Sequence, residues 1–138
     1  GSGNSIVDER FDHMDVAIVE HGVFGGTCLN VGCIPTKMYV YPADVAAHVR
    51  RAAKYGLDAT LDKVRWTDIR DRVFGRIDPI SAGGREYRVD RCPNVTVYSG
   101  HARFTGERAI SVDGAEPFTA DRVVIAAGGR PAIPQVIT

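Results

Sequence analysis

The stretch that decides the fold runs from residue 25 to residue 37 and reads Gly-Gly-Thr-Cys-Leu-Asn-Val-Gly-Cys-Ile-Pro-Thr-Lys. Its two cysteines, Cys28 and Cys33, are five positions apart. That separation puts their Cα atoms about 8 to 9 Å apart on a regular helix and about 16 Å apart on a strand, whereas a disulfide needs less than about 7 Å. A bridge therefore requires distorted backbone, and Gly32 supplies conformational freedom beside Cys33.

The residues after the pair predict a helix whose beginning favours thiolate chemistry. Pro35 is tolerated in a first helical turn, and the amides at a helix N-terminus stabilise a thiolate. Lys37 adds a positive charge one turn beyond Cys33. We expect the pair to cycle between dithiol and disulfide. A structural disulfide, two buried unbonded cysteines and half of a metal site remain as alternatives.

Two long helices and a strand are expected around this stretch. The compact apolar run at residues 15–20 predicts a buried strand that ends in an acid. The cysteine-pair helix is expected within about 27–56, ended by Gly56 and kinked or split at Pro42.

The second helix is expected over about 67–90. Thr67 is its expected N-cap, and Asp78-Pro79 and Gly83-Gly84 are expected to interrupt it.

The last third of the chain has the short apolar runs of β-structure. Strands are predicted over 95–98, 102–105 and 109–112, with Asp113-Gly114 as a turn. A further buried strand is predicted over 122–126. Together they predict a β-meander and a returning strand within about 94–128.

Composition narrows the classes of partner. The 138 residues contain 17 Lys plus Arg against 17 Asp plus Glu, so nothing indicates a nucleic acid or an anionic membrane. The longest apolar run, 123–127, is far shorter than the ~20 residues of a membrane-spanning helix. The length of 138 residues favours one domain. Three cysteines and the lack of a signal-peptide pattern favour a cytoplasmic location.

The stretch at 25–37 resembles the active-site signature of the flavoprotein disulfide reductases, the group that includes glutathione reductase and lipoamide dehydrogenase. Glu20, seventeen residues past Gly3, stands where a dinucleotide fold places the acid that binds the adenosine ribose. Residues 119–131 resemble the family's later flavin-side strand motif, with Ala127 at the usual threonine. Residues 100–102, Gly-His-Ala, stand where the family's backbone reaches the adenine.

The resemblance implies an α/β fold and covers nearly all of residues 1–138. They would form the N-terminal segment of a glutathione-reductase-type, Rossmann-like FAD-binding domain with an antiparallel β-meander. The first strand and the NAD(P)H and dimerisation domains of the family would be lacking. Asn4 stands where the last glycine of the flavin fingerprint is expected.

By the same resemblance, Cys28 would attack the substrate disulfide and Cys33 would lie against the flavin. Lys37 would tune the N5 side of the flavin, with a solvated or capping lysine as the alternative. The residues expected to bind the cofactor are Ser2, Gly3, Glu20, Gly26, Thr27, Lys37, Ala102, Ala127 and Gly128. Neither Cys92 nor the four histidines match a family motif, so we expect structural or exposed roles and no metal site.

Within the family, residues 38–45 and 72–80 are most similar to mycothione reductase, with lipoamide dehydrogenase as the alternative. The implied reaction uses FAD and NADPH or NADH to reduce a low-molecular-weight disulfide, most simply mycothiol disulfide, in a homodimer. This chain alone is expected to be inactive. The non-enzymatic alternative is a flavin-free thiol-redox or binding module.

Overall fold

The computed structural model describes residues 1–3, 7–130, 132–134 and 136, and it divides into two compact units. Gly1–Gly22 and Pro93–Thr138 make up the first unit, and Val23–Cys92 makes up the second. The departure from the fingerprint expected at Asn4 lies outside the described residues. No helix in the described part of the chain is both long and apolar enough to traverse a bilayer.

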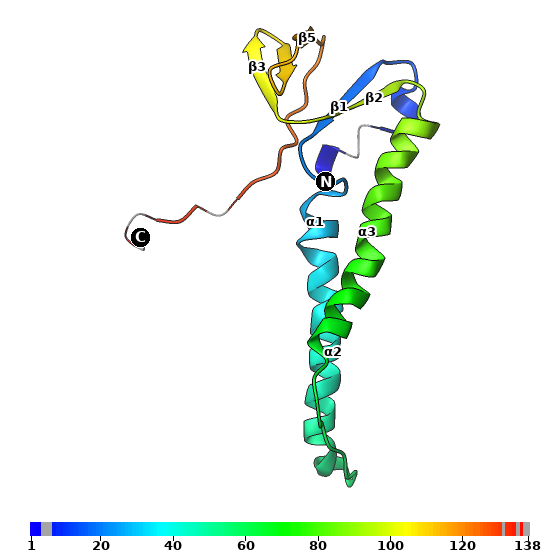
Figure 1. Ribbon diagram of the computed structural model, residues 1–138, viewed down its shortest axis with the longest axis vertical. Coiled ribbons are helices and arrows are strands. Elements are labelled where there is room, and N and C mark those ends of the chain that lie inside the picture. Colours follow the sequence, from blue (N-terminus) through cyan, green and yellow to red (C-terminus); the bar gives the residue numbers. More distant parts are fainter. Residues whose placement is uncertain (4–6, 131, 135, 137–138) are drawn as a thin grey trace. The chain divides into compact units, whose positions relative to one another are not determined.

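The first unit contains a parallel pair of strands (Figure 1). Strand β1 (Val16–Glu20) lies beside β2 (Val95–Ser99), with Glu20 opposite Ser99. Asn94 fixes the start of β2, because its Nδ2 donates to the carbonyls of Phe11 and Met14, each at 3.1 Å. The strand predicted over 15–20 is thereby confirmed, but its residues are half-buried or exposed and not buried as expected.

A small antiparallel sheet completes the regular structure of this unit. It has the order β3 (Ala102–Gly106), β4 (Ala109–Val112) and β5 (Phe118–Thr119). Asp113 and Gly114 have φ values of 50° and 80°, as expected for the turn predicted there. The meander is confirmed, except that its expected first strand is β2, which pairs with β1 instead.

The strand predicted over 122–126 is wrong. Val124 is 62% exposed and Ile125 is 76% exposed, and the segment is an irregular trace. A buried parallel strand needs neighbours that accept and donate its backbone hydrogen bonds. Among the residues that the structure describes, no strand pairs with this segment, so its apolar side chains alone do not make it a strand.

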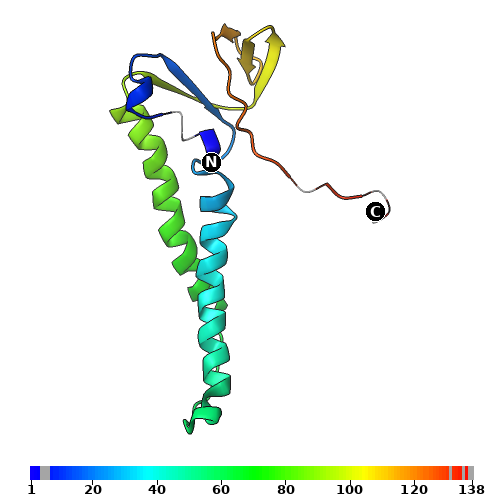
Figure 2. The ribbon, with the colours of Figure 1, turned by 180° about the vertical axis from the view of Figure 1, so that it is seen from behind.

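The second unit is built from helices. The short helix α1 (Gly26–Asn30) precedes α2 (Cys33–Arg51), which ends through a 3-10 turn (Ala52–Tyr55). The expected stop at Gly56 is confirmed, with a φ of 74°. Helix α3 (Trp66–Arg91) lies beside α2 in both views (Figures 1 and 2).

Helix α3 supplies the apolar core of this unit, because Val73 and Ile77 are 0% and 1% exposed. Ser81 continues the same face one turn later and is 7% exposed. Tyr39 of α2 stacks on Trp66 with ring centroids 5.2 Å apart, which adds a second contact.

Three expectations about the helices are wrong. Helix α2 is continuous through Pro42, so its first turns are not split off, and a kink at Pro42 stays a prediction. Helix α3 is continuous through Pro79 and through Gly83-Gly84, and its N-cap is Arg65 rather than Thr67. Packing of one helical face against a neighbour outweighs the local preference of proline and glycine to end a helix.

Candidate active site

The two cysteines meet at the junction of two helices. Cys28 lies in α1, and Cys33 is the first residue of α2. Both thiols are free and exposed. The break in the helix at Val31-Gly32 lets side chains five positions apart approach each other, which one regular helix would not allow.

The electrostatics of the pair differ from the expectation in one respect. The pKa of the Cys28 thiol is raised above its ordinary value, first by a hydrogen bond with the Cys33 side chain and then by desolvation. The backbone N–H of Cys33 and the positive charge of Lys37 lower this pKa, as expected from a helix N-terminus and a nearby cation. They do not outweigh the neighbouring thiol and desolvation, so the pKa of Cys28 is raised overall.

Gly32 lets the backbones of α1 and α2 come close. A Cβ atom at Gly32 would lie 2.7 Å from the carbonyl oxygen of Thr27 and 3.2 Å from the Cα atom of Cys28. Its φ of −133° lies outside the left-handed region, so a positive φ is not the reason for a glycine. The reason is the close approach of the Thr27-Cys28 backbone, which leaves no room for a side chain.

The loop before α1 is held by side chains from two helices. The carbonyl oxygen of Phe24 accepts hydrogen bonds from Ser81 Oγ at 2.6 Å and from Asn30 Nδ2 at 2.9 Å. Asn30 Nδ2 also donates to the carbonyl of Gly26 at 3.1 Å. Sequence reasoning missed Ser81. Its only signal is its place after Val73 and Ile77 in a four-residue repeat.

Other predicted residues of this unit lie around the pair. Thr27 is exposed beside Cys28, and Gly26 begins α1 with a φ of 69°. The side chain of Lys37 lines a small open pocket of about 260 Å³ together with Met38, Tyr41 and Arg72.

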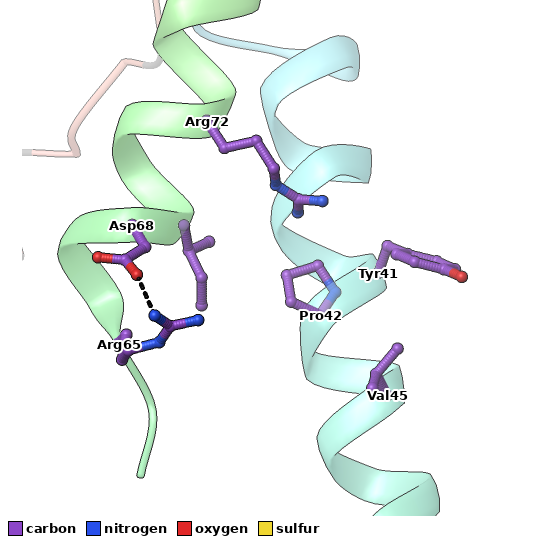
Figure 3. A pocket seen from close by; sticks show the side chains of 7 residues that line it. Tyr41, Pro42, Val45, Arg65, Asp68 and Arg72 are labelled. Carbon is purple, nitrogen blue, oxygen red and sulfur yellow. Dashed lines mark ion pairs between the residues drawn. The ribbon is translucent and has the colours of Figure 1, made fainter.

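A second open pocket, of about 310 Å³, lies between α2 and α3 (Figure 3). Arg72 extends from α3 toward Tyr41 and Pro42, and Arg65 pairs with Asp68 at 2.9 Å. Neither cysteine lines it, so it is separate from the redox pair.

In the first unit, the structure brings Glu20 to the residues expected near the adenine. The N–H of Gly100 donates to the carbonyl of Glu20 at 3.0 Å, and Ala102 begins β3. The Glu20 carboxylate accepts from the N–H of Gly22 at 2.9 Å and lies 3.5 Å from Nδ1 of His21. A carboxylate thus stands at the carboxyl end of β1, where a dinucleotide fold presents one to a ribose.

Asp113, which sequence reasoning assigned only to a turn, shapes this cluster. Its Oδ1 accepts a hydrogen bond from the N–H of His101 at 3.0 Å. A Cβ atom at Gly100, where φ is 150°, would collide with the Asp113 carboxylate. The ring of His101 meets that of His21 edge to face, with centroids 5.5 Å apart.

The structure also brings together two distant segments that resemblance assigns to the cofactor. A Cβ atom at Gly3 would lie 3.3 Å from the Cβ of Ala126, so the Ser2-Gly3 backbone approaches the segment with Ala127 and Gly128. Ala127 and Gly128 are exposed, and Gly128 has a φ of 74°.

Structural or exposed roles stay a prediction for Cys92 and the histidines. Cys92 is free and half-buried, and Nδ1 of His48 lies 2.7 Å from the carbonyl of Asp44. In the part of the chain that the structure describes, His, Cys, Asp and Glu do not gather in a group of three or more that could hold a metal ion.

Comparison with known proteins assigns a family. Residues 7–137 match the family described as pyridine nucleotide-disulphide oxidoreductase. The chain is 57% identical to mycothione reductase of Mycobacterium tuberculosis over 143 residues, covering 99% of this chain and 31% of that protein. It is 36% identical to mercuric reductase of Shigella flexneri over 127 residues, covering 88% of this chain and 22% of that protein.

The fold has a solved counterpart. The HOCl-induced flavoprotein disulfide reductase RclA of Escherichia coli superposes with a TM-score of 0.68 at 24% identity. The match covers 89% of this chain and 25% of that one. The α/β fold predicted from the sequence is thereby confirmed. The chain spans less than a third of the length of the relatives it matches.

Proposed function

Because the chain belongs to the pyridine nucleotide-disulphide oxidoreductase family, we propose that it supplies the cysteine-bearing part of an FAD-dependent disulfide reductase. The observation that carries this function is the meeting of Cys28 and Cys33 across Gly32. Their thiols interact, both are exposed, and Lys37 is near enough to act on Cys28. A buried structural bridge would need none of these three properties.

The chain's own residues account for the thiol chemistry. The Cys28 thiolate attacks one sulfur of the substrate disulfide, which releases one substrate thiol and leaves a mixed disulfide on Cys28. The Cys33 thiolate then attacks the Cys28 sulfur, releases the second substrate thiol and closes the Cys28–Cys33 disulfide. Lys37 and the N–H of Cys33 favour the attacking thiolate, because they offset part of the rise in the pKa of Cys28 that the Cys33 side chain causes. FAD, when bound, would supply electron transfer between NADPH or NADH and the disulfide.

The observed clusters fit the chemistry of FAD. Glu20 would accept hydrogen bonds from the ribose, and the backbone at Ala102 would meet the adenine. The pyrophosphate would be approached by Ser2, Gly3, Gly26 and Thr27. The cofactor would also contact Ala127 and Gly128, and the N5 side of the flavin would face Lys37. The support is the Glu20–Gly100 hydrogen bond and the close approach of Gly3 to Ala126.

Mycothiol disulfide is the proposed substrate. Its support is the 57% identity to mycothione reductase, against 36% to mercuric reductase. A homodimer, a cytoplasmic location and inactivity of this chain alone complete the proposal. The alternatives are another member of the family, such as a lipoamide dehydrogenase, and a flavin-free thiol module.

The test is a visible spectrum of the full-length protein during stepwise anaerobic reduction. We expect a flavin spectrum with a long-wavelength charge-transfer band after two electrons, which mycothiol disulfide discharges. The band should be absent from Cys33→Ser. If lipoamide or mercuric ion abolishes the charge-transfer band faster than mycothiol disulfide does, that compound is the better substrate. If the protein binds no flavin, only the thiol-module alternative remains.

A further inference from the structure

We propose that Ser81 on α3 is a positioning residue for the cysteine pair, and that its hydroxyl sets how readily Cys28 and Cys33 are oxidised to a disulfide. Ser81 lies outside the signature at 25–37, 48 residues beyond Cys33. Its role follows only if the pair is redox-active, as proposed above.

Burial makes the partner of Ser81 important. The residue is 7% exposed and shares a helical face with Val73 and Ile77, which form the apolar core of its unit. A hydroxyl at such a position needs a hydrogen-bond partner. Its partner is the carbonyl of Phe24, 57 residues earlier in the chain, at 2.6 Å.

Phe24 stands two residues before the short helix that carries Cys28. Asn30, the last residue of that helix, donates to the same carbonyl at 2.9 Å and to Gly26 at 3.1 Å. Asn30 therefore ties helix α1 to its own first turn, and Ser81 ties the loop just before α1 to α3. Because five residues form barely more than one turn, α1 depends on these ties to keep its place.

The consequence for oxidation follows from the geometry of the pair. Oxidation joins the two Sγ atoms, and the two thiols give two electrons and two protons to an external disulfide, which becomes two thiols. Closing that ring is easier when the sulfur atoms are already held near each other, because less conformational freedom is lost. Ser81 restricts the movement of α1 and hence of Cys28. Loss of its hydroxyl should therefore lower the fraction of the pair that is oxidised at a given ratio of oxidised to reduced dithiothreitol.

The experiment compares Ser81→Ala with a matched control in the full-length protein. Ser111→Ala is the control, because Ser111 is also buried, at 5% exposure, and donates its Oγ to the carbonyl of Ala115 at 2.7 Å. Both variants lose one hydrogen bond from a buried serine to a backbone carbonyl, but only one is tied to the loop before Cys28. Each protein is equilibrated in oxidised and reduced dithiothreitol at graded ratios, quenched with acid and alkylated. Mass spectrometry of the peptide with both cysteines then gives its oxidised fraction.

We expect Ser81→Ala to lower the equilibrium constant for oxidation about threefold to tenfold, as the loss of one hydrogen bond implies. For a two-electron couple this is a shift of about 15 to 30 mV toward the dithiol. Ser81→Thr keeps the hydroxyl and should stay within twofold of the wild type, as should Ser111→Ala.

The proposal is overturned if Ser81→Ala leaves the constant unchanged, moves it toward the disulfide, or moves it no more than Ser111→Ala does. Should Ser81→Ala fail to fold, Asn30→Ala removes the other donor to the Phe24 carbonyl and must shift the constant in the same direction. The readout needs neither flavin nor turnover. A failure of the reductase function would therefore leave this measurement interpretable.

Discussion

Gly32→Ala is the sharpest perturbation of the candidate site. The added Cβ would lie 2.7 Å from the Thr27 carbonyl oxygen, 3.1 Å from the Thr27 carbonyl carbon and 3.2 Å from the Cys28 Cα. All three atoms belong to the backbone, so no flexible side chain is available to move aside. The Thr27-Cys28 backbone must itself shift, which carries Cys28 away from Cys33.

The cost of this overpacking is about 1 to 3 kcal/mol. If the substitution destabilises the disulfide state relative to the dithiol state by half of about 3 kcal/mol, the reduction potential of the pair rises by about 30 mV and the pair becomes harder to oxidise. Gly75→Ala is the matched control, because a Cβ at Gly75, inside α3, meets nothing within 4 Å. That change should stabilise the helix by about 1 kcal/mol and leave the cysteine pair unaffected.

Two measurements on the full-length protein check these values. Hydrogen exchange of the α1 and α2 amides should rise in Gly32→Ala and stay unchanged or fall in Gly75→Ala. Titration of the thiol pair in dithiothreitol buffers should shift only in Gly32→Ala. If that variant is oxidised at the same ratio of oxidised to reduced dithiothreitol as the wild type, the close approach at Gly32 does not control the oxidation of the pair and the reasoning fails.

Three further predictions concern pH, packing and the cofactor. Because the folded pKa of the Cys28 thiol is raised, alkylation of Cys28 in the dithiol state should accelerate at a higher pH than in an unfolded peptide. For the same reason the folded dithiol should lose stability as pH rises past the ordinary thiol pKa through the raised one. Ile77→Ala should cost about 2 to 5 kcal/mol in denaturant titrations, and Ile80→Ala much less, since Ile77 is 1% exposed and Ile80 is 49% exposed. Glu20→Gln should weaken FAD binding about tenfold, measured by the fluorescence of released FAD. Glu116→Gln is the control, and equal FAD affinity in the two variants would mean that Glu20 does not bind the ribose.

Local sequence predicted the elements that depend on local interactions. The strand at β1, the turn at Asp113-Gly114 and the stop at Gly56 need only their own residues and immediate neighbours. The predicted interruption of α3 is wrong because the local propensity of Pro79 and Gly83-Gly84 does not alone decide where a helix ends. The face carrying Val73, Ile77 and Ser81 packs within its unit and keeps the helix continuous.

The strand expected over 122–126 failed for the opposite reason. Its apolar run satisfies the side-chain requirement of a buried strand, but a strand also needs a partner for its backbone groups. In the described residues β1 pairs with β2 and the three later strands pair with one another, so the run stays unpaired and exposed. Pairing is a property of the whole sheet and cannot be read from one segment.

Candidate site residues can be predicted from the sequence where their side chains would carry the chemistry. They cannot be predicted where a side chain serves to bind the backbone of another residue. Cys28, Cys33 and Lys37 are recognisable by type and spacing. Ser81 and Asp113 act instead by binding the backbone of Phe24 and His101, each at least twelve residues away. Every residue offers a similar carbonyl or N–H, so such a partner leaves no mark in the sequence. The contacts that hold the backbone near the recognisable cysteines and Glu20 are thus ones that only a structure reveals.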